Sequence, residues 1–264
     1  MNQLPLFFIT LLFCCLLMVA VWKVALRIKN AGIVDIAWAF AFVPLALLYR
    51  FLVDGEPVRQ NLITLMVLAW SLRLGIHLWK GFRSQHPAED GRYQELRRGV
   101  SGHEGFFFFW YFQAQGVLLA LVSLPILLSS FDSRIELCFS DVLGFLIWLV
   151  AMGGEALADH QLAVFKRNPS NQGKVCSSGL WHYSRHPNYF FEFLIWIAFF
   201  FYAFPAPWGL LSILSPALML GILLGVTGIP YAEEQALRSR GEAYRAYQRT
   251  TSAFFPWFPK RPIS

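Results

Sequence analysis

The feature that most constrains this chain is the run Phe193–Ala232, which contains no charged side chain. An α-helix rises about 1.5 Å per residue, so a run of roughly 40 residues covers near 60 Å, twice the hydrocarbon core of a bilayer. Proline cannot continue a helix, and two prolines stand within Pro205–Gly209. The run therefore predicts two membrane-spanning helices with a break at Pro205–Gly209.

Further apolar runs of spanning length precede this one. They are Leu4–Trp22, Gly32–Val53, Asn61–Trp79, Gly105–Phe131 and Asp141–Asp159. Of the 264 residues 56% are hydrophobic and 14% are charged, whereas soluble domains carry about 25% charged residues. This composition excludes intrinsic disorder and argues against a soluble globular enzyme. We predict an all-α integral membrane protein with seven transmembrane helices, organised as a single domain over residues 1–264.

Basic residues set the expected orientation. Most of the 22 Lys and Arg residues fall in the segments 23–29, 80–98, 166–185 and 238–261, which the predicted spans place on one side. Because basic connections stay in the cytoplasm, the N-terminus is expected outside and the C-terminus in the cytoplasm. The four cysteines form no CxxC pair, so no metal site is expected.

Polar and aromatic residues recur at helical spacing inside three of the predicted spans. The three sets are Trp70, Arg73 and His77; Glu155, Asp159 and Lys166; and Asn188, Glu192 and Trp196. Ionisable groups at membrane depth cost about 2.5–3.5 kcal/mol each on insertion scales and therefore mark function by default. The alternative is that they pair with one another and lock helices together. We interpret the three sets as the lining of a polar cavity open to the cytosol.

The connection Lys166–Asn188 alternates cationic and aromatic residues, among them Lys174, Tyr183 and Arg185. Arg and Lys bind phosphate, and aromatic rings stack on flat heterocycles. A membrane-embedded site of this kind favours a nucleotide cofactor over a nucleic acid. Neither GxGxxG after a strand nor GxxxxGK[ST] is present, so a helical, non-Rossmann site is expected. For the aromatic residues, anchoring in the membrane interface is the alternative interpretation.

The segment Gly179–Glu192, with the sequence GLWHYSRHPNYFFE, resembles the steroid 5-alpha-reductase superfamily and is most similar to its branch of small bacterial membrane proteins. The resemblance extends over most of the chain, through the segments 70–75, 89–93, 155–159, 226–230, 244–247 and 254–259. Relatives of the RHPNY portion also occur in sterol reductases and in isoprenylcysteine carboxyl methyltransferases.

This resemblance implies a membrane oxidoreductase of the 3-oxo-5-alpha-steroid 4-dehydrogenase type, which acts on CH–CH donors. NADPH would enter from the cytosol and reduce the C=C bond of a lipophilic enone, such as a delta-4-3-oxosteroid or a related sterol or isoprenoid. The expected location is the bacterial inner membrane, with the cofactor site facing the cytoplasm. Expected partners are the steroid-like substrate and membrane lipids, with no nucleic acid.

The resemblance also implies roles for individual residues. Asp35 matches the catalytic carboxylate, and Trp70 stands where the family has a tyrosine partner. The predicted cofactor-binding residues are Arg73, Arg83, Glu155, Asp159, Lys166, Lys174, Tyr183, Arg185, Asn188, Glu192 and Glu234. The sequence departs from the family at Phe191, where a small residue is usual, and at Glu233–Glu234, where the family places a histidine. These departures concern the steroid substrate more than the nucleotide.

Hydride addition to an enone builds negative charge on the carbonyl oxygen, which a donor must stabilise. We expect Asp35, kept protonated by apolar surroundings, to donate to this oxygen together with the Trp70 indole N–H. The alternative for Asp35 is an ion pair with Arg73. Two other classes stay open for the protein: an S-adenosylmethionine-dependent membrane methyltransferase of the isoprenylcysteine carboxyl methyltransferase type, and a non-enzymatic lipid-binding or transport protein.

Overall fold

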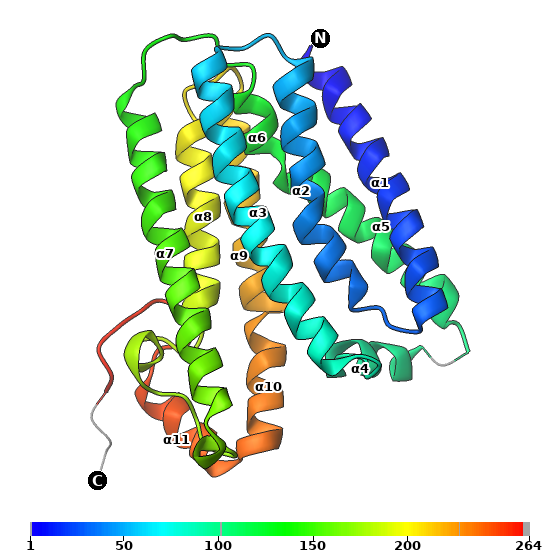
Figure 1. Ribbon diagram of the computed structural model, residues 1–264, viewed down its shortest axis with the longest axis vertical. Coiled ribbons are helices and arrows are strands. Elements are labelled where there is room, and N and C mark those ends of the chain that lie inside the picture. Colours follow the sequence, from blue (N-terminus) through cyan, green and yellow to red (C-terminus); the bar gives the residue numbers. More distant parts are fainter. Residues whose placement is uncertain (1, 101, 227, 261–264) are drawn as a thin grey trace. The chain divides into compact units, whose positions relative to one another are not determined.

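The computed structural model describes residues 2–100, 102–226 and 228–260 (Figure 1). Every regular element among these residues is a helix, which confirms the all-α prediction. The chain forms two compact units, and each is described by itself. Unit 1 comprises Met1–Ser140 and Tyr202–Ser215, and unit 2 comprises Asp141–Phe201 and Pro216–Ser264. A single domain over residues 1–264 stays a prediction.

Unit 1 is built from long helices that pack lengthwise. Its helices are α1 (Gln3–Ile28), α2 (Ile33–Leu52), α3 (Pro57–Gln85), α4 (Gly91–Gly99), α5 (Glu104–Val122), α6 (Leu124–Ser129) and the short η3 (Gly209–Ile213). α2 packs against α3 and α1 packs against α5. At Gly116 a Cβ atom would lie 3.2 Å from the Cys14 carbonyl oxygen, so glycine permits the close approach of α5 to α1. α4 is much shorter and joins the end of α3 to the start of α5.

A buried ionic cluster fixes the first turn of α3. Arg59, only 1% exposed, donates to the carbonyl oxygens of Arg134 at 2.7 Å and Glu136 at 2.5 Å, and lies 3.3 Å from a carboxylate oxygen of Asp132. We call these four residues the Arg59 cluster. These contacts join α3 to the segment after α6 within unit 1, so the cluster has a structural role.

Unit 2 carries a long helix, a structured loop and the C-terminal helices. Its elements are α7 (Phe139–Arg167), η1 (Pro169–Asn171), η2 (Gly179–His182), α8 (Pro187–Ala203), α9 (Leu214–Gly221), the π-helical η4 (Ile222–Val226), α10 (Ile229–Arg240) and α11 (Glu242–Thr250). α7 and α9 each begin with two residues that belong to unit 1. Gly241 separates α10 from α11. Its φ of +52° lies in the left-handed region, which glycine adopts readily and which ends the right-handed helix.

Six described segments are long and apolar enough to cross a membrane. They are α1, α2, α3, Glu104–Ser129, α7 and Gly209–Arg240. The remaining predicted span is α8, which has 17 residues and falls short of the about 20 that a crossing needs. The helices support a multi-pass membrane protein, whereas the count of seven and the orientation of the termini stay predictions.

The predicted break at Pro205–Gly209 is confirmed. α8 ends at Ala203, Trp208 adopts a left-handed conformation with φ of +62°, and η3 begins at Gly209. The segment 226–230, which contributes to the family resemblance, includes Thr227, which lies outside the described residues.

Candidate functional site

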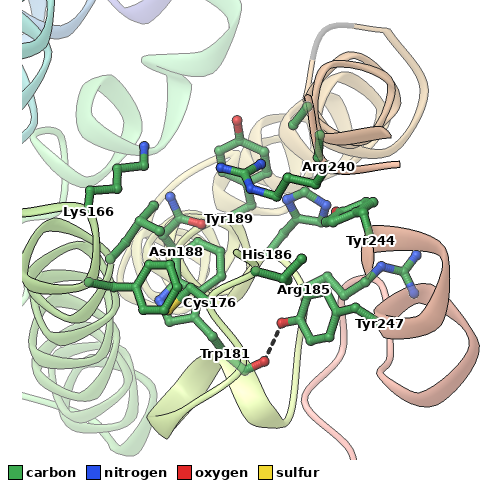
Figure 2. A pocket seen from close by; sticks show the side chains of 15 residues that line it. Lys166, Cys176, Trp181, Arg185, His186, Asn188, Tyr189, Arg240, Tyr244 and Tyr247 are labelled. Atoms are coloured by element: carbon green, nitrogen blue, oxygen red, sulfur yellow. Dashed lines mark hydrogen bonds between the residues drawn. The ribbon is translucent and has the colours of Figure 1, made fainter. Parts of the chain in front are cut away.

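A hollow lined by cationic and aromatic side chains lies within unit 2, beside the end of α7 (Figure 2). Its volume is about 250 Å³, and its wall comes from α7, the loop 168–186, α8, α10 and α11. We call it the cationic hollow. Its polar and aromatic lining residues are Lys166, Cys176, Trp181, Arg185, His186, Asn188, Tyr189, Arg240, Tyr244 and Tyr247.

Two hydrogen bonds hold the loop against α7. The indole N–H of Trp181 donates to the Ala158 carbonyl at 3.0 Å, and the backbone N–H of Leu180 donates to Oε1 of Gln161 at 2.9 Å. Gly179 has φ of +62°, and a Cβ atom there would lie 2.5 Å from the Gln161 side chain. The positive φ favours glycine here, and a side chain would also displace the Gln161 amide from its bond to Leu180.

Tyrosines of α11 hold the other side of the loop. The hydroxyl of Tyr247 donates to the carbonyl oxygen of Trp181 and, at 3.2 Å, to that of Ser184 (Figure 2). Burial raises the pKa of Tyr247 above its usual value and that of Tyr244 to about 12. Both phenols are therefore neutral at physiological pH and serve as hydrogen-bonding walls of the hollow.

Glu233 of α10 joins the loop to α11. Its carboxylate accepts from Nε of Arg185 at 2.6 Å and from Nε2 of Gln248 at 2.9 Å, and Nε2 of His186 lies 3.3 Å away. Arg185 also donates to the carbonyl oxygen of Thr251 at 2.6 Å. We call Glu233, Arg185, His186 and Gln248 the Glu233 cluster. Because Arg185 already neutralises Glu233 and bonds to backbone, the cluster acts as a scaffold for the hollow.

Lys166 and Arg240 give the hollow its positive charge. Each lies in the last turn of its helix, α7 or α10, and the two are close enough to repel each other. Nε of Arg240 donates to the Lys174 carbonyl oxygen at 3.0 Å, which orients the guanidinium group. Beside Lys166, Nδ2 of Asn188 donates to Oδ1 of Asp159 at 3.3 Å. An anionic ligand would relieve the repulsion between the two cations.

The structure brings part of the predicted cofactor-binding set together. Lys166, Arg185 and Asn188 line the cationic hollow, and Asp159 contacts it through Asn188. Arg185 was expected to contact phosphate directly. In the structure it instead donates to the Glu233 carboxylate and to the Thr251 carbonyl oxygen.

Other predicted residues of unit 2 do not line the hollow. They are Glu155, Lys174, Tyr183, Glu192 and Glu234. Glu234 pairs with Arg238 at 2.7 Å on an exposed face of α10. Glu192 accepts a hydrogen bond from the indole N–H of Trp196 at 2.9 Å, four residues along α8. This bond lies within one helix, so it does not join helices, and the role of Glu192 in cofactor binding stays a prediction.

Several lining residues were not among the predicted cofactor-binding residues. His186 and Tyr189 flank Asn188, and their rings stack 5.5 Å apart with planes 10° from parallel. Both stand in the RHPNY segment, which was a usable signal. Tyr244 stands in the resembling segment 244–247, whereas Arg240 gives no such signal, because Gly241 breaks the helix after it and spacing along the sequence does not place it at the hollow.

Asp35 lies in unit 1 and its ion-pair partner is Arg92 of α4, where Arg73 was the expected alternative. Nη2 of Arg92 lies 2.5 Å from Oδ2 of Asp35, and the Tyr93 hydroxyl donates to Oδ1 at 2.7 Å. Burial, together with the charge of Asp35, holds the pKa of Tyr93 well above its usual range. Both carboxylate oxygens thus accept hydrogen bonds from α4, one of them from a cation, and the expected donation from a neutral Asp35 stays a prediction.

Contacts of α4 extend this polar connection. The Glu89 carboxylate accepts from the backbone N–H of Ala31 at 2.7 Å and pairs with Arg97 at 2.9 Å, while Tyr93 is fully buried. Asp35 also lines a second cavity of about 160 Å³, together with His77 and other residues of unit 1. The segment between α3 and α5 is thus docked through specific contacts on the start of α2.

The other predicted residues of unit 1 have separate surroundings. Trp70 is fully buried and packs edge-to-face against Phe42, with ring centroids 5.0 Å apart, and its role as a donor to substrate stays a prediction. Arg73 is half-buried on α3. Arg83 lies 5.3 Å over the Trp79 ring. A chamber shared by Arg73, Asp159 and Asn188 stays a prediction.

Comparison with known families gives one match that covers most of the chain. The model described as "Protein of unknown function (DUF1295)" matches residues 21–251. The chain belongs to the DUF1295 family. The matched region contains every residue that lines the cationic hollow as well as Asp35 and Arg92.

Two relatives extend this comparison. An uncharacterized protein of Schizosaccharomyces pombe is 26% identical over 279 aligned residues, which cover 95% of this chain and 79% of the relative. A protein of Ustilaginoidea virens called probable O-methyltransferase ustE is 43% identical over 53 residues, which cover 20% of this chain and 18% of the relative. No solved structure matches. The DUF1295 family thus comes without a stated reaction.

Proposed function

We propose that this DUF1295 protein is an NADPH-dependent reductase that reduces the C=C bond of a lipophilic enone in a membrane, of the steroid 5-alpha-reductase type. Its substrate class is a delta-4-3-oxosteroid or a related sterol or isoprenoid, and its membrane is the bacterial inner membrane with the hollow facing the cytoplasm. One observation carries the proposal: Lys166, Arg240 and several aromatic rings line a single hollow in unit 2.

The residues of the cationic hollow fit the chemistry of a dinucleotide. Lys166 and Arg240 suit phosphate oxygens, and their mutual repulsion falls when an anion binds. The stacked rings of His186 and Tyr189 suit a flat heterocycle, and the Asn188 amide suits a ribose hydroxyl or a carboxamide. When bound, NADPH would supply the hydride. The protein's own contribution in unit 2 is binding and orientation.

In unit 1 Asp35 acts as a positioning residue. It holds Arg92, whose side chain is 22% exposed and whose Nε is buried without a hydrogen-bond acceptor among the described residues. A fixed guanidinium group is a suitable donor to the oxygen of an enone on which negative charge develops. This assignment replaces the expected donation from a neutral Asp35 and from the buried Trp70.

A titration of the purified full-length protein in detergent tests the proposal. The thermal unfolding midpoint is followed against NADPH, NADH and S-adenosylmethionine, and enone-dependent oxidation of NADPH is then followed by its absorbance. We expect NADPH to raise the midpoint at lower concentration than NADH, and a lipophilic enone to be consumed. Stabilisation by S-adenosylmethionine with none by NADPH would reject the reductase.

A methyltransferase is the second candidate, and the match to probable O-methyltransferase ustE favours it. The sulfonium group of S-adenosylmethionine is a cation that aromatic rings bind through cation–π contacts, and Tyr189, Tyr244 and Tyr247 supply such rings. The two cations of the hollow fit a methyl donor less well than they fit a ligand with several phosphates. The same titration separates the two candidates.

A further inference from the structure

The segment that follows α11 displays aromatic side chains on the outside of unit 2. Phe255 is 58% exposed, Trp257 72% and Phe258 76%. These three residues lie close together in sequence, in the segment that follows α11 (Figure 1, red). We call residues 251–260 the tail. Large aromatic groups exposed side by side mark a surface that contacts lipid or another apolar partner.

Hydrogen bonds hold this tail in place. The backbone N–H of Trp257 donates to the Tyr183 carbonyl at 2.9 Å, and that of Lys260 donates to the Thr250 carbonyl at 2.8 Å. The ring of Tyr183 meets that of Phe258 edge-to-face, with centroids 5.9 Å apart. The aromatic groups are therefore presented by a fixed backbone, so their exposure is a property of the folded unit.

The tail lies beside the first turns of the apolar helix α8. Phe254 is buried, with its ring centroid 5.8 Å from that of Phe190 and 5.9 Å from that of Phe193. Phe255 lies 6.0 Å from Phe190. In a membrane protein the first turns of an apolar helix stand at the boundary between hydrocarbon and headgroups, where tryptophan is enriched.

A pocket of about 360 Å³ opens between the end of α11 and the tail. Its three cations are Arg185, Arg249 and Lys260. Thr250 and Ser252 give it hydroxyl groups, and Trp257 gives it an apolar side. No carboxylate is among the described residues that line it. We call it the tail pocket. Its positive charge and its hydrogen-bond donors favour the binding of an anion.

The charge of Arg249 is only weakly compensated. Its Nη1 lies 4.0 Å from a Glu242 carboxylate oxygen, and both side chains are about two-thirds exposed. Such a pair contributes little, so the guanidinium group can turn toward a ligand. Arg185, which also lines the pocket, already bonds to Glu233 and to backbone carbonyls. Recognition of an anion in the tail pocket therefore falls to Arg249 and Lys260.

From these observations we propose that the tail pocket binds the headgroup of an anionic phospholipid of the surrounding bilayer. The phosphate lies against Arg249 and Lys260, and the acyl chains lie against Trp257, Phe258 and Phe255. A zwitterionic lipid carries its own cation beside the phosphate, so it gains less from the two basic residues. The proposal is independent of the reaction assigned to the cationic hollow.

Native mass spectrometry of the full-length protein in mild detergent tests this lipid site. The protein is titrated with phosphatidylglycerol or phosphatidylcholine of the same acyl chains. We expect phosphatidylglycerol to bind about tenfold more tightly, because each basic residue at the surface favours an anionic lipid. The double variant Arg249→Gln with Lys260→Gln should lose this preference. The matched control is Arg245→Gln, an exposed arginine on the same helix that already pairs with Glu242 at 2.6 Å.

Three outcomes would overturn the proposal. They are equal binding of the two lipids by the unaltered protein, an undiminished preference in the double variant, and the same loss of preference in Arg245→Gln. Inorganic phosphate is added in a parallel series. Displacement of phosphatidylglycerol by phosphate at equal concentration would assign the pocket to a free anion instead of a lipid. Binding of NADPH is measured on the same samples, so failure of the lipid site and failure of the reductase proposal are distinguishable.

Discussion

The Arg59 cluster of unit 1 and the cationic hollow of unit 2 use the same kind of residue to opposite effect. Arg59 is 1% exposed, and its guanidinium group meets two carbonyl oxygens and the carboxylate of Asp132. Arg240 and Lys166 line the same hollow, where the positive charge of each disfavours the charged form of the other. Glu233, an acid of α10, is already held by Arg185 and His186.

This difference separates a structural arginine from a binding one. A basic residue whose donors are all matched inside the fold stabilises the fold, and its charge is not available to a ligand. Two basic residues that repel each other across a hollow destabilise the empty site and favour the bound one. The sequence alone does not distinguish these cases, because both groups are basic residues within or beside apolar helices, whereas the structure buries Arg59 and leaves Lys166 exposed.

The largest expected effect is on the structural side of this comparison. Arg59→Gln removes a buried cation and leaves Asp132 with only its pairing to Arg134 at 2.6 Å. Breaking a buried ion pair costs about 3 kcal/mol or more, so we expect the thermal unfolding midpoint in detergent to fall by several degrees. NADPH should not restore it to the value of the unaltered protein. A midpoint within error of that of the exposed control Arg238→Gln would show that the cluster contributes nothing.

The binding side is tested by Lys166→Gln combined with Arg240→Gln. Removing two charge-assisted contacts with phosphate should weaken NADPH about thirtyfold, which corresponds to about 2 kcal/mol, with no loss in the midpoint of the ligand-free protein. Calorimetric titration measures the affinity. Arg238→Gln, on the exposed face of α10, is again the control and should leave the affinity unchanged. A double variant that binds NADPH normally would remove the cationic hollow as the cofactor site.

Asp35→Asn tests a case between the structural and the binding arginine, because Asp35 holds Arg92 in an ion pair that is only partly buried. It keeps a hydrogen-bond acceptor for Tyr93 but loses the ion pair with Arg92, so a loss of about 1 kcal/mol in stability is expected. NADPH affinity should stay within twofold while enone turnover falls sharply. Asp54→Asn, at an exposed position of unit 1, should change neither. If affinity and turnover fell together, Asp35 would be a purely structural partner of α4.

The smallest expected effect concerns Cys176, which lines the cationic hollow and is 7% exposed. Burial raises the pKa of its thiol, so less thiolate is present at pH 8 than in the unfolded chain. Alkylation by iodoacetamide, followed by peptide mass spectrometry, should be several-fold slower in the folded protein and should accelerate as the pH rises past 9. Saturating NADPH should slow it further by a few-fold. Modification at an unchanged rate with NADPH would place the ligand elsewhere.

Much of the fold was predictable because hydrocarbon imposes a simple rule on sequence. The charge-free run Phe193–Ala232, the break at Pro205–Gly209 and the positions of the longer helices follow from length and hydropathy. The predicted break marks the end of α8 at Ala203, but the charge-free run does not mark its start at Pro187, which precedes the run. In the cationic hollow, Lys166, Arg185 and Asn188 were predicted from charge, spacing and resemblance.

By itself, then, the sequence determined that this chain forms apolar helices of membrane-spanning length and carries basic and aromatic residues in the loop before α8. Only the tertiary structure decided which of those residues share a cavity and which are already paired. Arg240 and Tyr244 line the same hollow although Gly241 separates their helices. Glu192 accepts a hydrogen bond from its own helix, and Asp35 pairs with Arg92. The physical reason is that pairing depends on distances between segments far apart in the chain, which hydropathy and spacing do not encode.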